Sequence, residues 1–226
     1  MAEEGWIFGS TEGGTADDVN EKQLLHQIYT LADPDFTGRV TVPVLWDRQT
    51  RSIVNNESSE ILRMFNSEFD ALVDSSLDLY PEALRGQIDE LNSYIYPRIN
   101  NGVYRCGFAT TQEAYEEAYH DLFEGLDEID ARLASSRYLL GSQFTEADWR
   151  LFTTLIRFDA VYVGLFKCNV RRIDQYPNLF ALRRRLLDVD GVTGTVKLDQ
   201  IKTHYYASLR GVNPSGVVPA GPELVQ

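Results

Sequence analysis

Hydrophobic and polar positions follow two different periods in the first third of the chain. Between residues 21 and 32, apolar residues recur every three to four positions, which predicts a helix that ends before Pro34. Residues 39 to 46 are largely β-branched, and residues 52 to 54 continue this composition after a polar link. The change of period predicts a β-hairpin, in which Pro43 must lie at an edge or a bend because it has no N–H group to donate.

From residue 56 onward the helical period returns. Residues 56 to 69 form one predicted helix, with Asn56 as its expected N-cap. Beyond Pro81 the pattern is helical almost to the end, with apolar spacing that predicts helices around residues 88–99, 115–133, 149–163, 180–187 and 196–209. Residues 211 to 226 have no period and contain several prolines and glycines, which predicts an extended tail.

The sharpest local signal is a helix start near residue 145. Thr145 and Asp148 have the spacing of a capping box, in which each side chain accepts a hydrogen bond from the other residue's backbone. Phe144 and Trp149 occupy the two positions of a hydrophobic staple around it. The helix that follows should therefore be a buried core element.

The order of these elements predicts an α+β protein: a helix, a hairpin and a helix, followed by an all-helical domain of about 140 residues, which is an ordinary domain size. A two-stranded sheet is marginal in water by itself. Further strands, from the same or another chain, are therefore expected to complete it.

Composition and charge narrow the classes of function. The 226 residues are 43% hydrophobic and 12% aromatic, as in folded globular proteins. The net charge of −13 argues against binding to nucleic acid or to an anionic membrane, both of which require local positive charge. No apolar run approaches the roughly 18 residues of a membrane span, and the first residues are acidic, so we expect a cytoplasmic protein.

The candidates for metal, nucleotide and disulfide chemistry are few. Cys106 and Cys168 are flanked by apolar or aromatic residues and are expected to be buried structural thiols. His26, His120 and His204 are far apart and have no partner at metal-ligand spacing, so no metal site is expected. The sequence has no glycine motif for a nucleotide or dinucleotide.

Several strings, in order, carry a resemblance to one family. They are Gly38–Asp47 (GRVTVPVLWD), Ile53–Ile61 (IVNNESSEI), Asn100–Tyr104 (NNGVY), Arg157–Tyr162 (RFDAVY), Phe166–Cys168 (FKC) and His204–Tyr206 (HYY). The first two resemble the second half of a thioredoxin-like glutathione-binding domain. The others resemble the glutathionyl-hydroquinone reductases, the xi class of glutathione transferases, from about Gly5 to the end of the chain.

The resemblance implies a fold and a reaction. Residues 1–78 would be a thioredoxin-like domain whose N-terminal part is missing, residues 79–210 the all-helical C-terminal domain of a glutathione transferase, and residues 211–226 a tail. Such enzymes use no tightly bound cofactor and form homodimers. They release free hydroquinone from a glutathionyl conjugate, with glutathione, or here another small thiol, as co-substrate.

The resemblance also assigns glutathione-binding residues. Trp6 matches a tryptophan that contacts glutathione; the alternative is a core aromatic. Arg39, Val40, Thr41 and Val42 match a strand edge, before a proline that is cis in such folds, which would pair with the peptide-like backbone of the ligand. Glu57 and Ser58 match the pair that holds the γ-glutamyl end. Without the flanking strings, residues 56–59 would be interpreted as a helix cap only.

Three of the twelve tyrosines match catalytic residues of the family. Tyr104 matches its proton donor and acceptor. Tyr162 and Tyr205 match tyrosines that lower the pKa of the catalytic thiol, as hydroxyl groups directed at sulfur would. In another context these three tyrosines would be interpreted as ordinary packing residues.

One departure from the family leaves alternatives open. The family's attacking cysteine lies in a Cys-Pro-Trp-Ala-type motif upstream of the region matched here, and the position of neither Cys106 nor Cys168 corresponds to it. One hypothesis is an enzyme whose natural product is longer. A second is an inactive binding protein that retains the fold, and a third, less favoured by the tyrosine contexts, is a general glutathione transferase.

Overall fold

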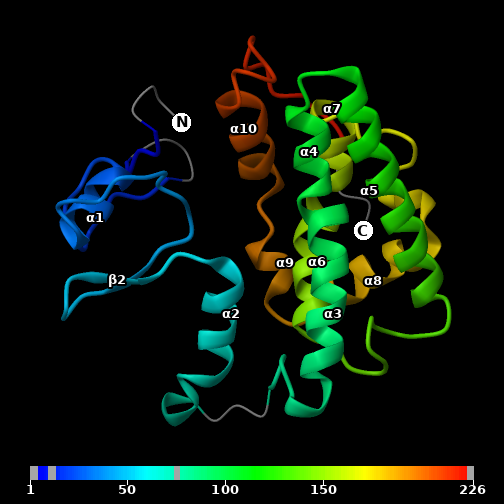
Figure 1. Ribbon diagram of the computed structural model, residues 1–226, viewed down its shortest axis with the longest axis horizontal. Coiled ribbons are helices and arrows are strands. Elements are labelled where there is room, and N and C mark those ends of the chain that lie inside the picture. Colours follow the sequence, from blue (N-terminus) through cyan, green and yellow to red (C-terminus); the bar gives the residue numbers. More distant parts are fainter. Residues whose placement is uncertain (1–4, 10–13, 74–76, 223–226) are drawn as a thin grey trace. The chain divides into compact units, whose positions relative to one another are not determined.

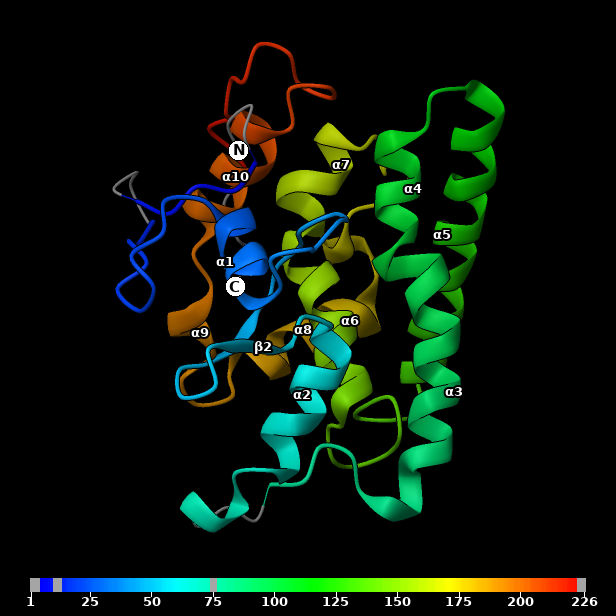
Figure 2. The same cartoon turned by 60° about the vertical axis from the view of Figure 1, so that its left-hand side comes forward.

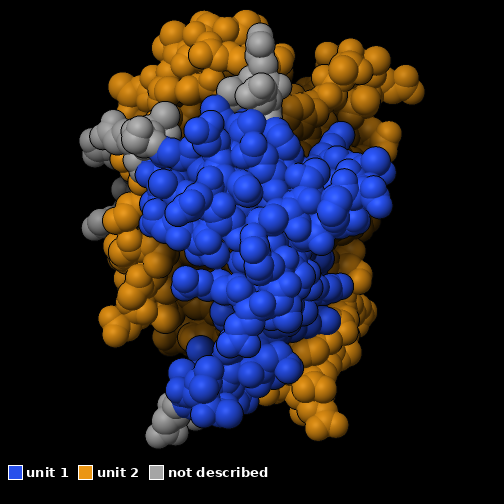
Figure 3. Space-filling view, turned by 90° about the vertical axis from the view of Figure 1, so that its left-hand side faces the viewer, with its two compact units in different colours: residues 1–77 blue, residues 78–226 orange. Residues whose placement is uncertain are grey.

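The computed structural model describes residues 5–9, 14–73 and 77–222, and the chain divides into two compact units. Unit 1 comprises Met1–Leu77 and unit 2 comprises Asp78–Gln226 (Figure 3). Unit 1 mixes helix and sheet, whereas the regular structure of unit 2 is helical within the described residues (Figure 1).

Unit 1 has the predicted order of helix, hairpin and helix. Its elements are α1 (Leu25–Ala32), β1 (Leu45–Asp47), β2 (Ser52–Asn55), α2 (Ser58–Ser67) and a 3₁₀ turn (Asp70–Leu72). Its buried cluster consists of Leu25, Ile28 and Tyr29 on one face of α1, with partly buried aromatic and branched residues around them. These partly buried residues are Trp6, Phe8, Phe36, Val40, Val44, Trp46 and Ile53.

The hairpin is confirmed, but the first strand is shorter than expected. β1 pairs with β2 antiparallel, from Leu45 opposite Asn55 to Asp47 opposite Ser52. The Asp47 carboxylate caps the turn by accepting from the Gln49 N–H at 2.7 Å. The predicted strand over residues 39–44 was wrong, since these residues pair with no strand in the described part of unit 1.

The first helix begins later than its apolar spacing predicted. It starts at Leu25, and Glu21 has a positive φ of 57°, outside the helical region. The Asp17 carboxylate accepts from three successive loop N–H groups, those of Val19, Asn20 and Lys22. These bonds hold the chain in a local turn, and a helix cannot begin until they end.

Unit 2 contains the eight remaining α-helices of the described residues (Figures 1 and 2). They are α3 (Arg85–Ile95), α4 (Gly102–Phe108), α5 (Gln112–Leu133), α6 (Glu146–Arg157), α7 (Val163–Leu165), α8 (Pro177–Leu187), α9 (Val192–Thr195) and α10 (Leu198–Ser208). Two π-turns interrupt them: η3 (Tyr96–Asn100) between α3 and α4, and η4 (Phe158–Tyr162) between α6 and α7. No helix of the described residues is long and apolar enough to cross a membrane.

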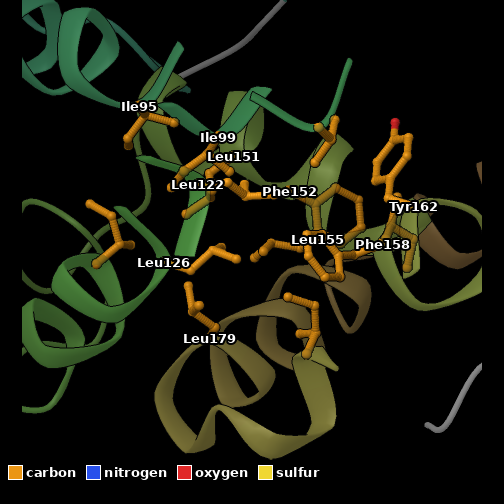
Figure 4. Close-up of a cluster of buried hydrophobic side chains, with 14 of the residues drawn as sticks. Ile95, Ile99, Leu122, Leu126, Leu151, Phe152, Leu155, Phe158, Tyr162 and Leu179 are labelled. Atoms are coloured by element: carbon orange, nitrogen blue, oxygen red, sulfur yellow. The ribbon is translucent and has the colours of Figure 1, made fainter. Parts of the chain in front are cut away.

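The core of unit 2 is built around α6. Leu151 and Leu155 of α6 are completely buried, as are Leu122 and Leu126 of α5 and Leu179 of α8. Figure 4 shows these side chains converging, with Tyr162 at the edge of the cluster beside Phe158. Burying a side chain of this size contributes about 1.5–3 kcal/mol. The core therefore extends directly to one of the predicted catalytic tyrosines.

The predicted start of α6 is confirmed in detail. Thr145 and Asp148 form the capping box, with Asp148 accepting from the Thr145 N–H at 2.8 Å. Asp148 also accepts from the Leu139 N–H at 2.9 Å, which ties the preceding turn to the helix. The staple residues Phe144 and Trp149 meet edge to face, with centroids 5.4 Å apart. The residues before α6 thus set its position in the core.

Candidate functional sites

The first candidate site lies in unit 1, where the Tyr29 hydroxyl joins two segments. It donates to the Thr41 carbonyl at 2.8 Å and accepts from the Asn56 side-chain amide at 3.0 Å. The same amide donates to the Thr41 hydroxyl at 3.2 Å. The segment ending at Val42 and the turn at Glu57 are therefore neighbours.

The segment from Arg39 to Val42 presents an open backbone edge. Val40 packs partly buried against the unit 1 cluster, while Arg39, Thr41 and Val42 are exposed. Within the described residues, the Val42 N–H and carbonyl have no hydrogen-bond partner. The Val42–Pro43 peptide bond is cis, as the family resemblance implied. An edge of this kind can pair with an extended peptide-like ligand.

Glu57 and Ser58 lie at the N-terminus of α2, and both are exposed. Glu57 is the N-cap, since its carboxylate accepts from the Ser59 N–H at 3.3 Å. The expectation that Asn56 caps this helix was wrong: Glu57 occupies the N-cap position, and the Asn56 amide N–H groups donate to Tyr29 and Thr41. The α2 N-terminus combines a positive dipole end, a hydroxyl and a carboxylate, which are the groups that an amino-acid zwitterion requires.

Trp6 packs partly buried against the unit 1 cluster, as Val40 does. Its main-chain carbonyl accepts from the Leu25 N–H at 3.0 Å. The sequence pattern did not identify Tyr29 as a site residue, and it singled out Asn56 only as a helix cap. A tyrosine at a buried position of an amphipathic helix is usually packing, and the bond from Tyr29 spans twelve residues of sequence.

The second candidate site lies in unit 2, where the three predicted tyrosines meet. Tyr104 comes from α4, Tyr162 from the end of η4 and Tyr205 from α10. The Tyr162 and Tyr205 hydroxyls lie 3.0 Å apart, and the Tyr104 and Tyr205 hydroxyls form a second, short hydrogen bond. Residues separated by 101 positions thus share one hydroxyl chain with Tyr205 at its centre.

The environment of the three phenols differs. Tyr162 and Tyr205 are 2% and 7% exposed, whereas Tyr104 is partly exposed. Burial, followed by the charge of its tyrosine neighbours, raises the pKa of Tyr162 and that of Tyr205. The two buried phenols therefore retain their protons and remain hydrogen-bond donors. Of the three tyrosines, Tyr104 is the one that solvent or a ligand can reach.

Phe166 forms the wall of the tyrosine cluster. Its ring lies 5.6 Å from that of Tyr104 and stacks on that of Tyr162 at 5.4 Å. Gly107 of α4 permits this approach, since a Cβ there would lie 2.3 Å from Phe166 ring atoms. Such aromatic walls suit a flat aromatic ligand, and pattern analysis had not identified Phe166 as a site residue.

The two cysteines are buried in unit 2, as expected. The Cys168 thiol donates to the Phe166 carbonyl at 3.7 Å. The neighbouring Cys168 thiol lowers the pKa of Cys106, and the Cys106 thiol, together with burial, raises that of Cys168. Both are at most 1% exposed, so neither offers an accessible attacking sulfur. The described residues contain no group of three or more His, Cys, Asp or Glu side chains arranged to hold a metal ion.

The geometry of unit 2 is that of a glutathione transferase, and residues 112–185 match the family model for the C-terminal domain of glutathione S-transferase. The chain is 51% identical to the glutathionyl-hydroquinone reductase PcpF of Sphingobium chlorophenolicum over 222 residues, which is 98% of this chain and 71% of that protein. It is 49% identical to a xi-class glutathione transferase of Natrialba magadii, with a TM-score of 0.96 over 100% of this chain and 69% of the other.

A third similarity bears on the ligand. The glutathione-bound structure of YqjG, a glutathione transferase homologue from Escherichia coli K-12, is 50% identical, with a TM-score of 0.97 over 100% of this chain and 73% of that one. The chain therefore belongs to the glutathionyl-hydroquinone reductase family, the xi class of glutathione transferases.

Proposed function

We propose that this protein is a glutathione-dependent reductase of glutathionyl-hydroquinones. The observation that carries the proposal is the hydroxyl chain of Tyr104, Tyr205 and Tyr162, which brings together the three tyrosines that match the family's catalytic positions. Similarity to proteins of that name, and to one solved with glutathione bound, supports it.

In unit 1, the proposed role is to bind the thiol co-substrate. This proposal interprets residues 1–78 as part of a thioredoxin-like domain, with the open edge at Val42 pairing with the glutathione backbone. Ser58 and the α2 N-terminus would hold the γ-glutamyl carboxylate, and Glu57 its ammonium group. Trp6 and Arg39 would contact the remainder of the ligand.

In unit 2, the proposed role is proton transfer to the hydroquinone. When a thiolate attacks the sulfur of the conjugate, the carbon–sulfur bond breaks and its electron pair stays on the ring carbon. Tyr104 would protonate that carbon, and the Tyr205 hydroxyl would then stabilise the Tyr104 phenolate by donating to it. A second thiol would resolve the enzyme–glutathione disulfide to give glutathione disulfide.

The source of the attacking sulfur distinguishes two candidate functions. Cys106 and Cys168 are buried, which favours, for residues 1–226 alone, a protein that binds the thiol without turnover. The reductase requires a further cysteine from the native product. A homodimer in the cytoplasm is part of the same proposal, and light scattering of the purified protein would measure its mass in solution.

Calorimetric titration of the purified chain with glutathione tests the binding step that both candidates share. Glu57→Gln removes the charge proposed to hold the ammonium and should weaken binding by about tenfold or more, the size of a charged hydrogen bond. Glu68→Gln, the same change at the C-cap of the same helix, is the control and should leave binding unchanged. Equal binding by both variants would contradict the proposed cradle.

A further inference from the structure

The η4 π-turn is the structural element that presents Tyr162. It runs from Phe158 to Tyr162, between α6 and α7, and Tyr162 is its last residue. π-turns are rare and occur frequently at functional sites, because the extra residue displaces the side chains that follow it. Phe158, Ala160 and Val161 of the turn are buried and apolar.

Asp159 is the one charged residue of this turn, and its carboxylate is held from two other elements. One oxygen accepts from the Ile173 N–H at 2.7 Å, and the other accepts from the Arg183 guanidinium of α8 at 3.1 Å. The side chains of Arg183 and Asp159 are 1% and 9% exposed. The turn is thus fixed to α8 and to the start of the 3₁₀ turn Ile173–Gln175 by directional bonds.

A buried ion pair of this kind is poorly explained by stability alone. Removing two charges from water costs several kcal/mol per ion, so a well-packed apolar pair is often equally stable or better. Apolar contacts are not directional, so the apolar residues of the turn do not by themselves fix its register. A shift of the register by one residue would rotate each side chain by about 100° around the helix axis. The carboxylate has two fixed partners and does not tolerate that shift.

The second π-turn has a comparable polar anchor. η3 (Tyr96–Asn100) precedes Tyr104, and its last residue, Asn100, donates to the Arg150 carbonyl at 3.0 Å and to the Thr154 hydroxyl at 2.7 Å. Both partners lie on α6. Each π-turn near the tyrosine cluster is therefore tied to a neighbouring element by one polar side chain.

We propose that Asp159 and Arg183 are positioning residues, which keep η4 in the register that directs the Tyr162 hydroxyl at Tyr205. Figure 4 shows the Tyr162 hydroxyl pointing away from Leu155 and Phe158 of the core, which leaves it available for this bond. A role in catalysis for the Tyr162–Tyr205 hydrogen bond rests on the proposed function. The coupling between the two phenols does not, and it can be measured without turnover.

The experiment measures that coupling by NMR of protein labelled at tyrosine Cζ. In the parent chain, Tyr162→Phe removes the 3.0 Å hydroxyl contact and should shift the Tyr205 signal. In an Asp159→Asn background, the same Tyr162→Phe change should shift the Tyr205 signal far less. An unchanged shift in that background would overturn the proposal.

The control is Glu146→Gln, an acidic residue at the other end of α6 that is 3% exposed and paired with Arg150. It should lower the melting temperature and preserve the coupling. Loss of coupling in this control would overturn the proposal, because general loosening would then explain the result. Arg183→Lys replaces Asp159→Asn if the latter fails to fold, since it keeps the charge and loses the guanidinium geometry.

Turnover gives the second readout. If the native product reduces glutathionyl-hydroquinones, Asp159→Asn should lower kcat by roughly a hundredfold, as small misplacements of reacting groups do, with KM for glutathione unchanged. A fall in kcat no larger than that of Glu146→Gln would contradict the role in catalysis. An inactive parent protein would refute the proposed function and leave the NMR result to decide the positioning.

Discussion

The two units of this protein obtain their geometry in different ways. Unit 2 has a continuous apolar core that spans α3 to α8 and reaches Tyr205 of α10. In unit 1, the buried cluster of the described residues consists of Leu25, Ile28 and Tyr29. In unit 1, the segments of the candidate site are joined instead by the Tyr29 hydroxyl and the Asn56 amide. One unit thus depends mainly on packing and the other on a few polar links.

The largest expected effect tests the dependence of unit 2 on packing. Leu126→Ala removes a completely buried side chain between α5 and α6 and should cost about 2–5 kcal/mol, because of lost burial and the cavity left behind. Thermal unfolding followed by circular dichroism measures it. Leu72→Ala in unit 1, where the side chain is 80% exposed, should stay within about 0.5 kcal/mol. Equal losses of stability in the two variants would contradict the contrast drawn between the two units.

The second prediction joins packing to the tyrosine cluster. Gly107→Ala places a Cβ 2.3 Å from Phe166, so the ring must move, at a cost of about 1–3 kcal/mol. The rings of Tyr104 and Tyr162 that contact Phe166 should show altered near-ultraviolet circular dichroism. Gly86→Ala in α3 has open space around it and should stabilise the helix by roughly 0.5–1 kcal/mol.

The third prediction tests the dependence of unit 1 on polar links. Tyr29→Phe keeps the ring in the cluster and removes the hydroxyl that joins Thr41 to Asn56, which should cost about 1 kcal/mol. Hydrogen exchange over residues 39–44 should become faster, and glutathione binding should weaken. Tyr96→Phe, at a tyrosine that is 54% exposed, is the matched control. Unchanged exchange in Tyr29→Phe would refute the role of the hydroxyl.

The smallest expected effect concerns pH. Burial lowers the pKa of His204 from its usual 6.5, and the positive charge of Arg157 contributes to the same shift. The unfolded chain therefore binds a proton at a higher pH than the folded chain does, and stability falls as pH drops below about 6.5 through the folded pKa. His204→Gln should remove part of that fall, measured as melting temperature from pH 8 to 5. An identical pH slope in both proteins would contradict it.

Much of the fold could be predicted because the helical elements obey their local patterns. The capping box at Thr145 and the apolar spacing of α5 and α6 are short-range features, so the sequence alone identifies them. The resemblance identified the three tyrosines, but it could not show that their hydroxyls bond to one another.

The features that the sequence did not predict correctly share one cause: they depend on contacts between residues far apart in the chain, which local residue preferences do not encode. Asn56 has the residue type of an N-cap, yet its side chain is directed at Tyr29, and Glu57 caps α2. Residues 39–44 have strand composition but no strand partner in the described part of unit 1. The Asp159–Arg183 pair joins positions 24 residues apart and left no pattern to recognise.

The most direct test of the account is an activity assay of the natural protein, which is residues 1–226 together with any further residues that are translated with them in the cell. The protein is incubated with glutathionyl-menadiol and glutathione, and the products are separated by chromatography. The account predicts free menadiol and one glutathione disulfide per turnover, with a fall of about 10²–10⁴-fold in Tyr104→Phe, the range for loss of a proton donor. Glutathione binding without release of menadiol would contradict the account.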